Sequence, residues 1–146
     1  MKKPWIAVLL LAATLAQAAP PVVGTYILAE RGVGVVEQLK PGRVTHLLYA
    51  FLLICGEGQR KQEAAACAGQ PAFSIAPHAD QDTFSAAFQR LKARDPQVQV
   101  LASVGGWGGS DPFFHLAATA EGREAFVKAS TDWLRAHPGF DGLDID

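Results

Sequence analysis

The chain has 146 residues, of which 49% are hydrophobic and 18% are charged, and its formal net charge at pH 7 is −1. This length and apolar content suffice for one compact hydrophobic core. Because the charges nearly balance and no run of basic residues is present, the chain lacks the positive surface that holds a phosphate backbone. Nucleic acid is therefore not an expected partner.

The first 18 residues have the pattern of an export signal. A basic start, Met1–Lys3, precedes an apolar stretch from Trp5 to Leu15, and Ala16–Ala18 supplies small residues for cleavage. We expect a signal peptide over residues 1–18 and a mature chain that is secreted, to the periplasm or the extracellular space, with no membrane attachment. The apolar stretch is shorter than the roughly 20 residues that span a bilayer, so a permanent anchor is the weaker alternative.

Four apolar runs predict β-strands. Their apolar character is nearly continuous rather than strictly alternating, which is typical of strands buried on both faces of a parallel sheet. The runs are Val22–Ala29, Val44–Ile54, Val98–Val104 and Phe140–Asp146.

Two helical patterns separate the later strands. The first stripe has the spacing i, i+3, i+4 and i+7, with Asp80 or Asp82 as the expected N-cap, and consists of Phe84, Ala87, Phe88 and Leu91. The second stripe runs from Phe126 to Leu134. Strands that alternate with helices predict a right-handed parallel α/β arrangement. Between the first two strands, Gly32 and Gly34 are expected to interrupt any helix.

The segment from Leu52 to Gln81 is long for a simple connection between a strand and a helix. It contains the only two cysteines of the chain, Cys55 and Cys67. In an oxidising compartment this pair can close a short loop, worth about 2–3 kcal/mol in the chain-entropy model. We therefore expect an ordered insertion held by a disulfide, with two free buried thiols as the alternative.

The last apolar run carries carboxylates. Side chains alternate along a strand, so Asp144 and Asp146 point to one face while Leu143 and Ile145 point to the other. Burying such carboxylates is costly unless they are hydrogen-bonded or share a proton, so the pattern indicates a chemical role. A solvated acidic turn is one alternative. A site for a hard cation is another, although the segment lacks the ligand spacing of a calcium loop.

The third run ends in a glycine-rich corner. Gly105 and Gly106 follow the run directly and permit close approach of a backbone or a ligand, and Trp107 comes next. An indole beside an acidic pocket suits a sugar ring, whose apolar face lies on the aromatic plane. A tight turn with a packing tryptophan is the alternative, and the lysine and spacing of a phosphate-binding loop are absent.

These motifs together resemble one protein family. Ser103-Val104-Gly105-Gly106, followed by Asp141-Gly142-Leu143-Asp144-Ile145-Asp146, is similar to the paired signatures of the family-18 glycoside hydrolases, the chitinases and their relatives. The resemblance covers nearly all of the mature chain and is closest to secreted bacterial enzymes of the chitinase A type. It extends through Val22–Gly24, Thr45–Phe51, Ile54–Gly56 with the second cysteine, Ser110–Phe114, and Arg123 with Phe126.

The resemblance implies an α/β fold, the (β/α)8 TIM barrel, of which this chain holds about the first four strands. Residues 19–146 are then the N-terminal half of a catalytic domain. Active sites of this fold lie at the carboxyl ends of the strands, where Tyr26, Ser103 and Asp144 are expected to converge.

The implied chemistry is retaining hydrolysis of β-1,4-linked N-acetylglucosamine in chitin or chitooligosaccharides, with the acetamido carbonyl of the substrate as nucleophile. Asp146 orients the acetamido group and stabilises the oxazolinium ion in this scheme. Asp144 shares a proton with Asp146 and is held by Tyr26 and Ser103, since two adjacent like charges do not both ionise cheaply. No metal or other cofactor is implied.

Other residues take supporting roles in the same scheme. Phe51 and Trp107 line the sugar subsites, and Asp141, on the opposite parity, ties its strand to the neighbouring ones. Gly105 and Gly106 support the site.

The family signature ends in a glutamate, the general acid, which would stand two residues after Asp146. The 146-residue sequence ends at Asp146 and does not include this position. We therefore expect the 146-residue polypeptide by itself to be inactive as a hydrolase. A chitinase-like lectin, which binds chitin without cleaving it, is the alternative function. Peptidoglycan or endo-N-acetylglucosaminidase specificity on the same scaffold also stays open.

Overall fold

The computed structural model describes residues 21–146. The export signal predicted over residues 1–18 lies outside this range. Within residues 21–146, no helix combines the length and the apolar character needed to cross a bilayer.

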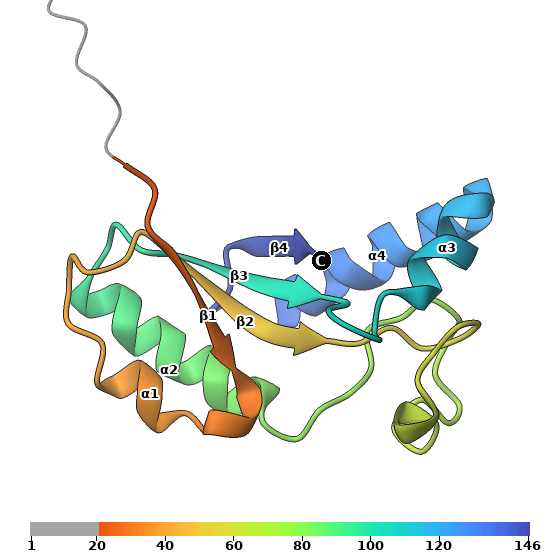
Figure 1. Ribbon diagram of the computed structural model, residues 1–146, viewed down its shortest axis with the longest axis horizontal. Coiled ribbons are helices and arrows are strands. Elements are labelled where there is room, and N and C mark those ends of the chain that lie inside the picture. Colours follow the sequence, from red (N-terminus) through yellow and green to blue (C-terminus); the bar gives the residue numbers. More distant parts are fainter. Residues whose placement is uncertain (1–20) are drawn as a thin grey trace, which may run out of the picture.

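Four parallel strands form one sheet in the order β1-β2-β3-β4 (Figure 1). Each strand lies inside one of the four apolar runs, so the predicted parallel α/β arrangement is confirmed. β2 is shorter than its run at both ends, and Ile54 forms an isolated bridge with Ile75 of the following connection. The strands are β1 Gly24–Leu28, β2 His46–Leu52, β3 Gln99–Val104 and β4 Gly142–Ile145.

The two long helices are α2, Gln81–Arg94, and α4, Ala120–Ala136, and they contain the two predicted apolar stripes. Asp80 occupies the N-cap position of α2 without accepting a capping hydrogen bond, whereas the hydroxyl of Thr119 accepts one from the backbone N–H of Gly122 at α4. α4 therefore begins at Ala120, before the predicted apolar stripe that starts at Phe126.

Shorter helices were harder to predict. α3, Asp111–Ala118, has only eight residues, and its apolar side chains are contiguous rather than periodic. The prediction that glycines prevent a helix between β1 and β2 is wrong for one turn, because α1 spans Gly34–Glu37. Two 3-10 turns complete the set, η1 at Ala29–Arg31 and η2 at Lys61–Glu63.

The hydrophobic core lies between the sheet and the helices. The ring of Tyr49 lies 4.8 Å from that of Phe84 in α2 and 5.5 Å from that of Phe140, which in turn lies 4.9 Å from the indole of Trp133 in α4. Burying each aromatic or aliphatic side chain of this kind contributes about 1.5–3 kcal/mol. Strand residues that share this buried face are Leu47, Val100, Ala102 and Val104.

The opposite face of the sheet is only partly buried within the described residues. Tyr26, Leu48 and Leu101 occupy one row of the strand register on this face, and the Tyr26 side chain is 50% exposed. The prediction that the strands are buried on both faces is therefore correct for one face only, the face against which the helices pack.

The insertion after β2 is ordered, as predicted. Cys55 and Cys67 form a disulfide, so the alternative of two free thiols is wrong. The backbone N–H of Cys55 donates to the carbonyl of Ser74, and that of Phe73 donates back to the carbonyl of Cys55. These bonds place the insertion beside the carboxyl end of β2.

Candidate active site

A cluster of three predicted side chains lies at the carboxyl ends of the strands. The hydroxyl of Ser103 donates a 2.7 Å hydrogen bond to Oδ2 of Asp144, its register partner in β4. The phenol of Tyr26 in β1 reaches the same carboxylate oxygen at 3.5 Å. Ala50 of β2 is the other register partner of Ser103. Residues from three strands thus converge on one carboxylate.

Both acidic side chains, Asp144 and Asp146, influence the ionisation of the Tyr26 phenol. Desolvation raises the pKa of its phenol, and the charges of Asp144 and then Asp146 raise it further. A tyrosine with a pKa above its usual value of about 10 stays protonated at neutral pH. The phenol is therefore a hydrogen-bond donor to Asp144.

Asp146 follows β4 directly, and its main chain is held on two sides. Its backbone N–H donates to the carbonyl of Val104 at 2.9 Å, and its carbonyl accepts a 2.7 Å bond from the hydroxyl of Ser110. Asp146 is exposed among the described residues, and its main chain is fixed.

The glycine-rich corner has no room for larger residues. Gly105 has a φ of +107°, and a Cβ placed there would come within 2.3 Å of the carbonyl oxygen of Asp146. Gly106 has a φ of +75°, and its Cβ would come within 2.9 Å of the Phe51 ring. Only glycine combines a positive φ with such close approach. The corner therefore brings β3, the end of β4 and an aromatic ring into direct contact.

An open cleft of about 500 Å³ lies beside this cluster. Phe51 and Trp107, the two predicted sugar-binding residues, both line it, and the indole of Trp107 is fully exposed. The ring of Phe51 lies 6.1 Å from that of Tyr26, which links the cleft to the acidic pair. The remaining lining residues are Leu28, Ala29, Glu30, Ala50, Leu53, Arg60, Glu63, His78, Asp80 and Gly105.

Sequence patterns did not identify the charged residues that two loop segments contribute to the cleft. Arg60 and Glu63 lie in the disulfide-closed loop, and His78 and Asp80 lie before α2, so no periodicity or shared motif connects them. Only the fold brings the two segments together. Among residues 21–146, no three histidine, cysteine or acidic side chains are gathered closely enough to hold a metal ion.

Asp141 lies at the other end of β4, away from the cluster. Its Oδ2 accepts a 2.8 Å hydrogen bond from the backbone N–H of Val100, and its Oδ1 pairs with Lys92 of α2. These contacts join β4 to β3 and to a helix. They support a structural rather than a catalytic role for Asp141.

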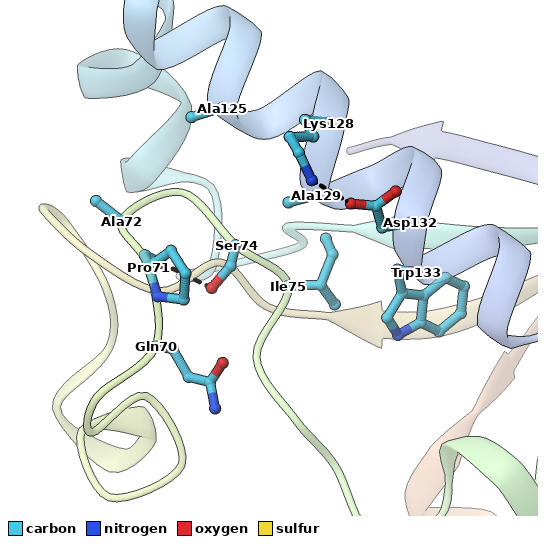
Figure 2. Close-up of a pocket in the computed structure, with 10 residues that line it drawn as sticks. All are labelled: Gln70, Pro71, Ala72, Ser74, Ile75, Ala125, Lys128, Ala129, Asp132 and Trp133. Carbon is cyan, nitrogen blue, oxygen red and sulfur yellow. Dashed lines mark hydrogen bonds and ion pairs between the residues drawn. The ribbon is translucent and has the colours of Figure 1, made fainter.

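A second hollow, of about 370 Å³, lies between α4 and the segment that follows the disulfide loop (Figure 2). Lys128 and Asp132 form a 2.6 Å ion pair along one side, and the indole nitrogen of Trp133 donates to Gln81. Because none of the predicted site residues lines this hollow, it is separate from the acidic cluster. Its other lining residues are Gln70, Pro71, Ala72, Ser74, Ile75, Ala125 and Ala129.

Fold and site together define the class of this protein. The four parallel strands and their covering helices form the first part of a (β/α)8 barrel, with polar side chains gathered where the strands end. Residues 25–146 match the glycosyl hydrolases family 18, and the chain belongs to this family.

Individual relatives include chitinases and a chitinase-like agglutinin. The chain is 29% identical over 139 residues to a probable endochitinase of Orgyia pseudotsugata multicapsid polyhedrosis virus, covering 76% of this chain and 25% of the viral protein. It is 27% identical to a chitinase-like agglutinin from Robinia pseudoacacia, with a TM-score of 0.65 over 84% of this chain and 33% of the agglutinin. A chitinase mutant from Cycas revoluta, solved with (GlcNAc)4, is also 27% identical, with a TM-score of 0.62 over 86% of this chain and 33% of the mutant. The chain thus spans about a quarter to a third of the length of these relatives.

Proposed function

We propose that this chain supplies the first four strands of a chitinase that hydrolyses β-1,4-linked N-acetylglucosamine polymers. The observation that carries the proposal is the shared hydrogen bonding of Tyr26 and Ser103 to Asp144, with Asp146 two residues further on, at the strand ends of a family-18 chain. The exposed indole of Trp107 beside this cluster supports a carbohydrate ligand, because sugar rings stack on aromatic planes.

The acidic pair serves the acetamido group of the substrate in this proposal. The acetamido carbonyl oxygen attacks C1 as the glycosidic C1–O bond breaks, and the leaving oxygen takes a proton from the glutamic acid of the family signature. Asp146 stabilises the resulting oxazolinium ion, while Asp144 holds the shared proton. Water then attacks C1, returns a proton to the glutamate and reopens the ring, so the anomeric configuration is retained.

Export of the mature chain is part of the proposal. The Cys55–Cys67 disulfide supports it, because disulfides persist in oxidising compartments and are rare in the cytosol. We also propose that the protein is of the chitinase A type. The motif Ile54-Cys55-Gly56 and the pairing of Cys55 with Cys67 support this assignment.

A chitin-binding lectin is the second candidate. The similarity to the Robinia agglutinin favours it, since that protein is described as chitinase-like and as an agglutinin. The residue encoded two positions after Asp146 distinguishes the two: glutamate provides a general acid for hydrolysis, whereas glutamine or an apolar residue does not.

Turnover by the full-length protein tests the proposed function. We expect release of the reporter from a chitotriose glycoside, with the first product in the β configuration, as measured by fluorescence and by proton NMR. Binding of chitotriose without turnover would favour the lectin, and neither binding nor turnover would overturn both candidates.

A further inference from the structure

The hydroxyl of Ser110 joins two segments that are far apart in the sequence. It lies 2.7 Å from the carbonyl oxygen of Asp146, at the end of β4, and 2.9 Å from the carbonyl oxygen of Gly106, in the corner after β3. A hydroxyl has a single proton to donate, so the two carbonyls share it, and the shorter distance favours the bond to Asp146. The side chain therefore binds the main chain of the candidate active site from both segments.

Ser110 does not cap the helix that follows it. It occupies the N-cap position of α3, where a serine side chain ordinarily accepts a hydrogen bond from the second or third N–H of the helix. The second helical residue is Pro112, which has no N–H, and the N–H of the third, Phe113, donates to the backbone carbonyl of Ser110 at 3.0 Å. Within residues 21–146, the Ser110 side chain accepts no capping hydrogen bond. Helix capping therefore does not explain this hydroxyl, and its bonds to the two carbonyls do.

The two carbonyls depend on Ser110 to different degrees. The carbonyl of Gly106 also accepts a 3.0 Å bond from the N–H of Gly109, an ordinary distance for an N–H donor. Among the described residues, the carbonyl of Asp146 has one further donor, the N–H of Gly106 at 3.4 Å, which is longer than the usual range of about 2.7–3.2 Å. Removal of the hydroxyl is therefore expected to leave the corner and Trp107 in place and to loosen the main chain at Asp146.

The carbonyl that Ser110 holds belongs to the part of the main chain from which the proposed catalytic groups extend. The N–H of Asp146 donates to the carbonyl of Val104 at 2.9 Å without the help of Ser110, so β4 stays paired with β3 up to this residue. In the proposed function, the Asp146 carboxylate stabilises the oxazolinium ion, and the general acid follows two positions later in the family signature. Misplacing a catalytic group by about 1 Å costs up to about 100-fold in rate. The position of this one carbonyl therefore affects both groups.

We propose that Ser110 is a positioning residue for the hydrolysis: its hydroxyl fixes the carbonyl of Asp146, so that the Asp146 carboxylate and the general acid meet the substrate in the correct geometry. This inference rests on the proposed function. Ser110 acts through the main chain of Asp146 and not by contact with the substrate. A serine outside the paired family signatures thereby affects kcat rather than KM.

Steady-state kinetics of Ser110→Ala in the full-length protein, with a chitotriose reporter, tests this role. We expect kcat to fall about 10- to 100-fold and KM to stay within about twofold, because the corner that carries Trp107 keeps its second hydrogen bond. Ser110→Thr is expected to restore kcat to within about threefold of the unaltered protein, since threonine offers the same donor.

Ser74→Ala is the matched control. The hydroxyl of Ser74 also donates a 2.7 Å bond to a main-chain carbonyl, that of Pro71, but Ser74 lines the second hollow, which is separate from the acidic cluster. This substitution removes the same kind of bond and is expected to leave kcat and KM unchanged.

Urea denaturation of the same variants separates positioning from folding. Ser110→Ala is expected to lose little stability, since both carbonyls keep an N–H donor. A large loss of stability would assign the hydroxyl to the fold and contradict the positioning role.

The kinetic results separate the two proposals. If the unaltered protein hydrolyses the reporter and Ser110→Ala keeps its kcat, the positioning role is wrong and the proposed function stands. A fall in kcat that Ser110→Thr shares in full, or that Ser74→Ala matches, also contradicts the role. If the unaltered protein does not hydrolyse the reporter, the proposed function itself fails, and the positioning role fails with it.

Discussion

Replacing Asp146 with asparagine is expected to lower kcat of the full-length protein on a chitotriose reporter by about 100- to 1,000-fold, with little change in KM. The amide keeps the shape of the carboxylate but removes the negative charge that stabilises the oxazolinium ion. Because the main chain of Asp146 is held by Val104 and Ser110, the substitution is expected to leave the end of β4 in place. Steady-state kinetics over a range of substrate concentrations measures both constants.

Asp132→Asn is the control for this experiment. Asp132 is an exposed carboxylate of α4 that pairs with Lys128 and Arg135 on the surface, away from the strand ends. Its substitution removes the same charge and is expected to leave kcat within about twofold, because exposed ion pairs contribute little to stability and Asp132 lies away from the acidic cluster. Equal kcat values for Asp146→Asn and the unaltered protein would contradict the proposed role.

Replacing Gly105 with alanine is expected to destabilise the protein by about 2–5 kcal/mol. The alanine is strained at a φ of +107°, and its methyl group overlaps the carbonyl oxygen of Asp146, Oγ of Ser110 at 2.9 Å and the ring of Phe113 at 3.0 Å. Two of these neighbours, Ser110 and Asp146, are joined by a hydrogen bond from the Ser110 hydroxyl to the Asp146 carbonyl. They cannot move apart to make room without breaking this bond. Urea denaturation followed by tryptophan fluorescence measures the loss.

Gly69→Ala separates backbone strain from close packing. Gly69 also has a positive φ, of +76°, but an added Cβ there meets nothing within 4 Å. Its substitution is expected to cost only about 1–2 kcal/mol, from the left-handed backbone alone. If both alanine variants lose the same stability, the close contact between β3 and the end of β4 is not what requires glycine at the corner.

Much of the fold was predictable because buried positions recur as a regular pattern of apolar residues in the sequence. The stripe of Phe84 and Phe88 marks α2, and the continuous apolar run around Val100 marks a strand of a parallel sheet. α3 has no such pattern, because two helical turns contain too few repeats of the apolar spacing. Its position depends on tertiary contacts, including the packing of Phe113 on Phe126 at 5.6 Å.

The sequence likewise identified some residues of the candidate site and missed others. Asp144 and Ser103 were identifiable because each lies in a short motif at a strand end, and strand register then makes them neighbours. Arg60 and His78 were not, since they lie in irregular segments whose positions depend on a disulfide and on loop packing. Alternation on a strand predicted which face a carboxylate occupies, but it did not indicate which loop lies opposite.

Selectivity for the acetamido group tests the central claim most directly. Titration of the full-length protein with sulfur-linked analogues of chitotetraose and cellotetraose compares ligands that share linkage and length and differ in that group. The acidic pair is expected to give at least about 100-fold tighter binding of the chitotetraose analogue, because polar groups left without their partner penalise the other ligand. Equal affinity for the two tetrasaccharides would contradict the assignment of Asp144 and Asp146 to acetamido recognition.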